Sequence, residues 1–295
     1  MGTQHTKGGP YEYGHPRLAR CHESTGATVL LRAPAGRLKK IIFLIVVLVG
    51  ITFILKMSNK ENNNNNLANV GNDPSIVEVD PIAHASMVLN WDGMAIYTDP
   101  VGKAAMFLGK PDADIILLTD IHGDHLDVDT LKRVVVEKTI IVAPQAVADK
   151  MPEEMKAQVS VMNNGEVADK LGFKIEAVPM YNLPESTESY HTKGRGNGYV
   201  VEKGGTRVYI SGDTAGVPEM INLQDIDMAF VAMNLPYTMS VENAADAVLA
   251  FKPKKVYPYH YRTPEGFSDV AKFKTLVNAG NPEIEVVQLE WYGTP

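Results

Sequence analysis

The sequence predicts an α+β fold in which two β-sheets are covered by helices. Runs of β-branched and apolar residues alternate with turn signals over residues 74–295, and a few stretches with helical character lie between them. This order of strands with interspersed helices is typical of sheets that bury one face against each other and carry helices on the other. With 295 residues, of which 45% are apolar, the chain is long enough to bury such a core.

Each expected element has a local signal. A hairpin is expected over 86–100, because Asp92-Gly93 is a favoured two-residue turn. A continuously apolar strand, buried on both faces, is expected over 113–120, and a helix capped by Asp127 or Asp129 is expected over 128–138. Further strands are expected at 139–144, 173–181, 198–213, 227–234, 254–260 and 283–289, and further helices at 145–157 and 240–251.

Three segments precede this body. Residues 1–36 have no sustained periodicity and are expected to be a disordered or mis-annotated extension. The apolar run "IIFLIVVLVGITFIL" predicts a transmembrane anchor helix within 37–57, although its 15 residues, about 22 Å of helix, equally suit a cleaved signal peptide. Residues 58–74 are asparagine-rich and are expected to be a linker to the domain at 75–295.

Charge is distributed unevenly along the chain. Residues 1–57 carry eight Lys/Arg and two Asp/Glu, whereas residues 58–295 carry 20 and 33. Because positive charge stays on the cytoplasmic side, the domain is expected to be membrane-anchored and extracytoplasmic, or secreted after signal cleavage. An acidic body argues against nucleic acid as a partner. The only cysteine, Cys21, leaves the body without a thiolate metal ligand.

Metal-competent side chains gather at the ends of the expected strands. The stretch "IILLTDIHGDHLD" (115–127) breaks from an apolar run into two histidines and three aspartates, and other candidates follow later strands. Imidazole and carboxylate groups are the usual zinc ligands when thiolates are absent. The candidate ligands are Asp120, His122, Asp124, His125, His191, Asp213 and His260.

Four motifs in the body resemble those of the metallo-β-lactamase superfamily. They are "TDIHGDHLD", "YHTKGRGNGYVV", "VYISGDTAG" and "VYPYHY", in the family's order, with 66, 22 and 47 residues separating His125, His191, Asp213 and His260. Within the superfamily the chain is most similar to the branch of ascorbate-6-phosphate lactonase. The resemblance implies an αββα sandwich with the site along one edge of the sheets. It also implies two ligand groups and a bridge: Asp120, His122 and His191; Asp124, His125 and His260; and Asp213.

Asp120 departs from the family pattern, which has histidine at this position. A carboxylate still binds zinc, but as a harder, anionic ligand it shifts the preference toward manganese or iron. In one interpretation, Asp120 also weakens metal binding at the first ligand group, so that a single metal binds at the second group. In another interpretation Asp120 binds no metal and orients a ligand histidine.

The resemblance implies a metal-dependent hydrolase with one or two Zn²⁺ ions, or Mn²⁺ or Fe²⁺, acting on a small molecule. Asp124 is expected to be the catalytic residue that orients the attacking hydroxide. A lactone, ester or phosphodiester-type bond is the expected target, and the alternatives are a β-lactam and a non-catalytic binding or sensor module. Tyr181, Asn182 and Tyr237 are expected to contact substrate, with loop packing as the alternative. His84 is expected to support the site without ligating metal.

Overall fold

The computed structural model describes residues 76–292. The predicted extension at 1–36, anchor at 37–57 and linker at 58–74 lie outside the described residues. Within the described part, no helix has both the length and the apolar character needed to cross a membrane.

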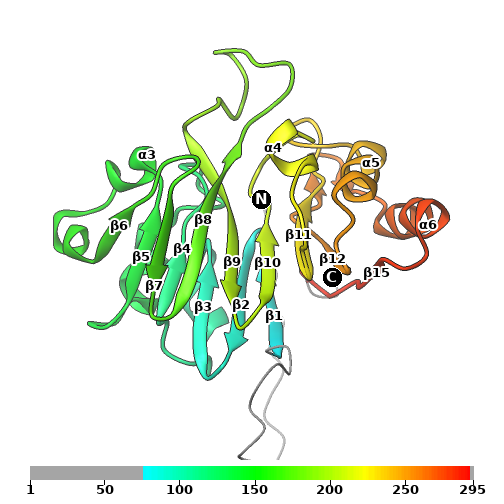
Figure 1. The fold of residues 1–295 in the computed structure, drawn as a ribbon. Coiled ribbons are helices and arrows are strands. Elements are labelled where there is room, and N and C mark those ends of the chain that lie inside the picture. The colour runs from blue at the N-terminus through cyan, green and yellow to red at the C-terminus, as the bar shows by residue number, and fades with distance from the viewer. Residues whose placement is uncertain (1–75, 293–295) are drawn as a thin grey trace, which may run out of the picture. The chain divides into compact units, whose positions relative to one another are not determined.

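The first sheet contains six strands in the order of the sequence, and Figure 1 shows them side by side: β1 (Val77–Ala83), β2 (Ser86–Trp91), β3 (Met94–Thr98), β4 (Ile115–Leu117), β5 (Ile140–Ala143) and β6 (Val159–Val161). The pairs β1–β2 and β2–β3 are antiparallel, and β3 to β6 are parallel. The predicted hairpin over 86–100 is confirmed, because Asp92 and Gly93 form the turn between β2 and β3, both with positive φ.

The second sheet contains seven strands, in the spatial order β15, β12, β11, β10, β9, β8, β7. Their bounds are β7 (Val167–Lys170), β8 (Phe173–Met180), β9 (Gly196–Lys203), β10 (Thr206–Ile210), β11 (Met228–Ala232), β12 (Lys255–Tyr259) and β15 (Glu285–Val286). The pairs from β7 to β10 are antiparallel, and β10, β11, β12 and β15 are parallel. The last strand is shorter than the one predicted over 283–289. A separate small hairpin is formed by β13 (Arg262–Thr263) and β14 (Gly266–Phe267).

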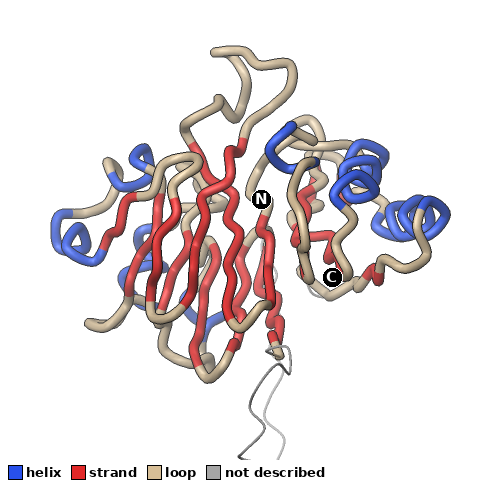
Figure 2. Tube along the Cα trace, viewed as in Figure 1, coloured by secondary structure: helices blue, strands red, loops and turns tan. Residues whose placement is uncertain are grey.

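Helices cover the outer face of each sheet, as Figure 2 shows in blue. The elements beside the first sheet are η2 (Ala104–Phe107), α2 (Val128–Val134), α3 (Gln145–Ala148) and η3 (Glu153–Gln158), and those beside the second are α4 (Pro218–Ile221), α5 (Val241–Phe251) and α6 (Val270–Gly280). Buried Leu131 and Met155 pack in one cluster with Ile116 of the first sheet. Phe251 packs edge-to-face on Tyr209 of the second sheet, with ring centroids 5.9 Å apart. The predicted two-sheet fold with outer helices is therefore confirmed for the described residues.

Two helices begin where the sequence predicts a cap. The Asp127 side chain accepts hydrogen bonds from the backbone N–H groups of Asp129 and Thr130, at 3.0 and 3.1 Å, so Asp127 caps α2. Ser240 accepts a hydrogen bond from the Asn243 N–H at 3.1 Å and caps α5. These caps satisfy backbone donors that the first turn of a helix leaves free.

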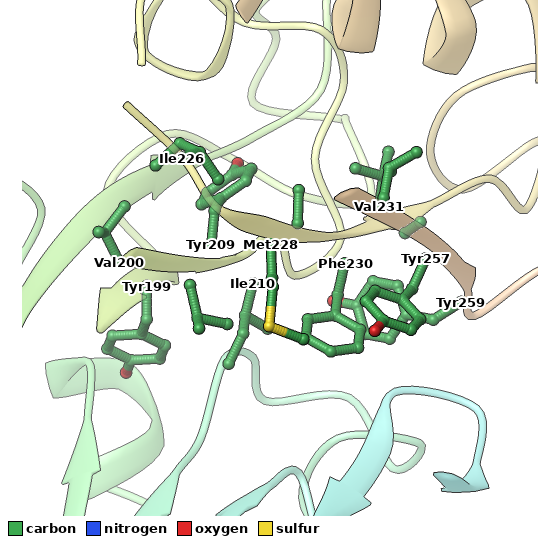
Figure 3. Packing of buried hydrophobic residues seen from close by; sticks show 14 of the residues in the cluster. Tyr199, Val200, Tyr209, Ile210, Ile226, Met228, Phe230, Val231, Tyr257 and Tyr259 are labelled. Atoms are coloured by element: carbon green, nitrogen blue, oxygen red, sulfur yellow. The ribbon is translucent and has the colours of Figure 1, made fainter. Parts of the chain in front are cut away.

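The space between the sheets is filled by large buried side chains. In Figure 3, Ile210, Met228 and Phe230 point to one side of the second sheet, and Val231 points to the other. Each fully buried side chain of this size contributes about 1.5 to 3 kcal/mol of hydrophobic stabilisation. The sandwich thus forms a rigid scaffold for the loops that follow β4, β8, β10 and β12.

Candidate metal centre

The loop after β4 carries four of the predicted ligands. His125 and Leu126 both donate backbone hydrogen bonds to the His122 carbonyl, at 3.0 and 2.8 Å, which folds the loop tightly. Gly123 lies in this loop, but a Cβ at Gly123 would meet no atom within 4 Å and its φ is not left-handed. The backbone hydrogen bonds, rather than glycine, therefore account for the turn.

The other three predicted ligands come from the second sheet. His191 lies between β8 and β9, Asp213 follows β10, and His260 follows β12; all three are buried. Strands β10 and β12 belong to the parallel part of their sheet and end at the same edge. The predicted residues from both sheets therefore come together at one place.

Four side chains converge in what we call the second ligand group: Asp124, His125, Asp213 and His260. His125 Nε2 lies 3.2 Å from His260 Nε2 and 3.3 Å from Asp213 Oδ2. His260 Nε2 lies 3.4 Å from Asp213 Oδ1 and 3.4 Å from Asp124 Oδ2. Tetrahedral ligands at 2.0 to 2.2 Å from zinc are about 3.3 to 3.6 Å from one another, so these separations suit a metal ion.

The first ligand group is formed by Asp120, His122 and His191, again with Asp213. His191 Nε2 lies 3.2 Å from His122 Nδ1 and 3.4 Å from Asp213 Oδ2. Asp120 Oδ2 lies 2.7 Å from His122 Nδ1 and 3.7 Å from His191 Nε2. Asp213 therefore reaches both groups, as a bridging carboxylate would.

Buried charges give the centre a field that favours a cation. Burial alone would raise the pKa of Asp213, but His260 and His125 hold this pKa well below its ordinary value. Burial alone would lower the pKa of His260, but Asp213 and Asp124 raise it to about 9. Asp213 Oδ1 is buried and has no hydrogen-bond partner in the described part of the chain. A divalent cation would satisfy this oxygen and replace the protons that the carboxylates attract.

Asp99 supports the second group and was missed as a functional residue. It directly follows β3 and is fully buried, with its Oδ2 at 2.8 Å from His125 Nδ1 and its Oδ1 accepting a hydrogen bond from the Thr119 N–H. Burial raises the pKa of Asp99, and His125 lowers it in turn. The Asp99 carboxylate holds the His125 proton on Nδ1 and leaves Nε2 free for a metal. Its position at the end of the strand beside β4 was the available signal.

Arg195 pairs with Asp120 and was also missed. Its Nε donates to Asp120 Oδ1 at 3.1 Å and its Nη2 donates to Oδ2 at 3.0 Å, a bidentate ion pair. Asp120 is fully buried, whereas 20% of the Arg195 side chain is exposed. The same Nη2 lies 3.5 Å from His122 Nε2. Because Arg195 lies in a glycine-rich stretch of the second motif, "YHTKGRGNGYVV", no sequence pattern pointed to Asp120 as its partner.

Gly196 allows β9 to cross the ligand loop closely. A Cβ at this position would lie 2.8 Å from the Thr119 carbonyl oxygen, 3.3 Å from Asp120 Oδ1 and closer still to the end of the Met180 side chain. Glycine at position 196 therefore lets the backbone of β9 pass close to the ligand loop.

The three predicted substrate-contacting residues all take part in internal hydrogen bonds. Asn182 Oδ1 accepts from the His191 N–H, and Asn182 Nδ2 donates to the Tyr237 carbonyl, both at 2.8 Å. The same carbonyl lies 3.2 Å from His191 Nδ1. Tyr181 is buried, and its hydroxyl donates to Glu219 at 2.9 Å and accepts from Lys193 at 3.2 Å. Asn182 and Tyr237 thus orient His191, and substrate contact by the three residues stays a prediction.

His84 lies behind His260. The His84 carbonyl accepts the His260 N–H at 3.2 Å, and the two rings meet edge-to-face with centroids 5.6 Å apart. A nitrogen of His84 also lies within 4.8 Å of ligand atoms of Asp124 and His260. Both histidines have positive φ, a conformation that costs energy for a residue with a side chain and is held by the surrounding structure.

A pocket of about 760 Å³ adjoins the centre through Asn182, which lines it and also holds His191. Its other lining residues, from the loops after β8, β10 and β11 and from α5, are Leu183, Pro184, Ser186, Glu188, Ser189, Tyr190, Ala215, Gly216, Ile221, Leu235, Pro236, Thr238, Met239, Asn243, Asp246, Ala247 and Ala250. The lining is largely apolar, with two carboxylates and neither lysine nor arginine among these described residues. The pocket therefore suits an uncharged, partly apolar group.

Comparisons with known proteins agree with this geometry. Residues 78–260 match the family model described as a beta-lactamase superfamily domain. A UPF0173 metal-dependent hydrolase of Thermus thermophilus is 33% identical over 234 residues, which are 73% of this chain and 100% of that protein. One of Thermococcus onnurineus is 34% identical over 173 residues, 56% of this chain and 75% of that protein.

Solved structures are similar as well. The crystal structure of a metal-dependent hydrolase from Parabacteroides distasonis is 38% identical, covers 72% of this chain and 93% of its own, and superposes with a TM-score of 0.65. A metallo hydrolase from Ignicoccus hospitalis covers 72% of this chain and 95% of its own, with a TM-score of 0.61. At 24% identity, the second likeness supports the fold alone.

The predicted membrane attachment and extracytoplasmic or secreted location are corrected by these comparisons. The Thermus thermophilus hydrolase aligns over its entire length with 73% of this chain, and a Pyrococcus furiosus hydrolase aligns over 92% of its length with 68%. The aligned part accounts for all or nearly all of each relative, so neither relative supports a membrane-anchored or secreted protein. A family resemblance gives no support to a membrane partner, and we withdraw that prediction.

Proposed function

Because the chain belongs to the metallo-β-lactamase superfamily, among its metal-dependent hydrolases, we propose that it hydrolyses a lactone or carboxylic ester of a small, uncharged molecule. The observation that supports metal-dependent hydrolysis most strongly is the convergence of seven ligand-type side chains from four loops. Two histidine pairs in this centre, His122–His191 and His125–His260, have ring nitrogens 3.2 Å apart, a separation suited to a shared metal ion.

The donor set fits zinc or a similar divalent metal. Asp124, His125 and His260 would hold one ion, Asp120, His122 and His191 would hold another, and Asp213 would serve both. A metal ion bound here supplies a water of lowered pKa and a positive charge that polarises the scissile carbonyl. The mixture of imidazole and carboxylate donors favours zinc first, with manganese or iron as alternatives.

Asp124 has the geometry for handling a proton. Its side chain is 43% exposed, more than the buried Asp213, so it faces the space that a substrate would enter. Burial would raise the pKa of Asp124, but His260 and His125 lower it below its ordinary value, so the side chain is ionised at neutral pH. As an ionised acceptor, Asp124 can orient a water and accept its proton.

The adjoining pocket supports the choice of substrate class. Its lining carries Glu188 and Asp246 and no cationic side chain among the residues given above, which disfavours a phosphodiester. Leu183, Leu235 and Met239 provide apolar surface for the acyl or alkoxy part of an ester. Nothing in the described structure favours a β-lactam or a non-catalytic module.

The test is turnover by the purified full chain with its metal content measured. We expect bound metal and hydrolysis of neutral lactones or esters that a chelator abolishes and added Zn²⁺ restores. The same panel should contain a phosphodiester and a β-lactam, and the His125→Ala variant should be inactive on every member. Turnover of the phosphodiester alone would contradict the proposed substrate class, and absence of bound metal would contradict the proposed function.

A further inference from the structure

The two ligand groups differ in how their polar atoms are satisfied within the protein. In the first group, Asp120 accepts from Arg195 at both oxygens and lies 2.7 Å from His122 Nδ1. A carboxylate can only accept at this distance, so Nδ1 of His122 carries the proton. His122 Nε2 is then an acceptor for Arg195 Nη2 at 3.5 Å. Arg195, Asp120 and His122 thus form a closed network that needs no metal ion.

The second group has no such closure. Asp99 fixes the His125 proton on Nδ1, so the lone pair of Nε2 faces Asp213 and the Nε2 of His260. Asp213 Oδ1 makes no hydrogen bond within the described residues, and its neighbour His260 Nε2 lies 3.4 Å away. Unlike His122, the three side chains His125, Asp213 and His260 are all buried. An unpartnered buried acceptor is costly, and a cation between these atoms removes that cost.

Charge adds to the difference. The guanidinium of Arg195 cancels the charge of Asp120, so the first group offers little net negative charge beyond its share of Asp213. The second group contains Asp124 and Asp213, with Asp99 directly behind His125. A metal on His122 Nδ1 would also move the proton of that ring to Nε2, where it would face the N–H of Arg195. Two donors would then oppose each other.

We propose that Arg195 makes the two metal positions unequal: the position among His125, Asp213 and His260 fills first, and the pairing of Arg195 with Asp120 weakens the other. The Arg195–Asp120 pair has no net charge, so it contributes to the centre as one neutral ligand would. The guanidinium remains as a fixed cation at the edge of the centre. This inference rests on the proposed metal-dependent function and assigns a role to a residue outside the ligand set.

The experiment is a Zn²⁺ titration of the metal-free full chain, followed by calorimetry and by metal analysis after dialysis. We expect the wild type to bind one equivalent of Zn²⁺ tightly and the second at least about tenfold more weakly. The reason is that the Arg195 guanidinium and a zinc ion in the first ligand group would repel each other even when largely screened. Arg195→Gln should tighten the second equivalent by about tenfold for the same reason. Arg207→Gln is the matched control, because Arg207 is 23% exposed and pairs with Glu202 away from the centre.

A double-substitution cycle separates charge from geometry. Asp120→His alone leaves Arg195 without its carboxylate and should weaken the second equivalent further, and Asp120→His combined with Arg195→Gln should restore it. Equal filling of both positions by the wild type would overturn the inference while leaving the proposed function intact. Loss of the second equivalent in Arg195→Gln, with Arg207→Gln unchanged, would also overturn it. A wild type that binds no zinc would contradict the proposed function instead.

Discussion

Around the shared Asp213, the two ligand groups differ in the exposure of the histidine that each takes from the loop after β4 and in the charge beside the ligands. His125 and His260 are almost fully enclosed, whereas the His122 side chain is 39% exposed. His125 of the second group is backed by Asp99, and Asp120 of the first group is paired with Arg195. A buried acid behind a histidine strengthens metal binding, and a cation beside a carboxylate opposes it. On the proposal made above, the two groups would therefore bind metal with different strength although their side chains are similar.

The substitution expected to have the largest effect is Asp213→Ala, because it removes the residue that both groups share. Its oxygens lie 3.3 to 3.4 Å from nitrogens of His125, His191 and His260. We expect both metals to be lost and turnover to fall by more than about a hundredfold, since even residues that only orient a ligand cost 10- to 100-fold. Asp129→Ala, at an exposed position in α2, is the control. Retention of both metals by Asp213→Ala would show that Asp213 is no bridge.

Two supporting residues allow the groups to be compared directly. Asp99→Asn disturbs the hydrogen bond to His125 Nδ1 and should weaken the tight zinc equivalent by about 10- to 100-fold. Asn182→Ala removes the acceptor for the His191 N–H and should weaken mainly the loose equivalent, by about tenfold or less. Zinc titration of both variants measures the two effects. The comparison fails if Asn182→Ala lowers the affinity for the tightly bound zinc equivalent more than Asp99→Asn does.

Gly196→Ala tests whether the first group depends on the close crossing of β9. The added Cβ would press on the Thr119 carbonyl and on Asp120, and we expect it to lower the free energy of unfolding by about 1 to 3 kcal/mol. Gly123→Ala, in the ligand loop that β9 crosses, is a matched control, because a Cβ at Gly123 has open space. Urea unfolding of the two variants gives the difference, and equal stability of the two would contradict the packing described here.

The smallest expected effect is a pH dependence of the metal-free protein. The pKa of His260 is raised from 6.5 to about 9 in the fold, mainly by Asp213 against the effect of burial. Its charged form therefore stabilises the fold fully below pH 6.5, and this contribution is lost as the pH rises through about 9. Chelator-treated protein should lose about 1 to 2 kcal/mol of stability over this window, whereas zinc-loaded protein should not. If the melting temperatures of the metal-free and zinc-loaded forms changed equally with pH, this prediction would be contradicted.

Local signals predicted much of the fold. The Asp92-Gly93 turn, the caps Asp127 and Ser240, and the buried strand β11 all follow from residues close together in the sequence. Helix α6 was missed, although Asp269 caps it through a hydrogen bond to the Lys272 N–H and its buried Phe273 and Val277 are four residues apart. The cap and this four-residue spacing are local signals that predict a helix.

The supporting residues of the site could not be predicted in the same way. The ligands stand out because each follows a strand in a recognisable motif, but Arg195 meets Asp120 only because β9 lies against the loop after β4. A hydrogen bond from the Asn197 N–H to the Thr119 carbonyl, at 3.0 Å, fixes that contact between the two sheets. Asp99 likewise reaches His125 only because β3 and β4 are paired in parallel. Such partners depend on long-range register, which no local pattern encodes.

The most direct test is a crystal structure of the zinc-loaded full chain with anomalous data collected at the zinc edge. We predict a strong anomalous peak within coordination distance of His125, Asp213 and His260, and a second, weaker peak beside His122 and His191. An anomalous map with no peak among these side chains, from protein that contains stoichiometric zinc, would place the metal elsewhere and contradict the account.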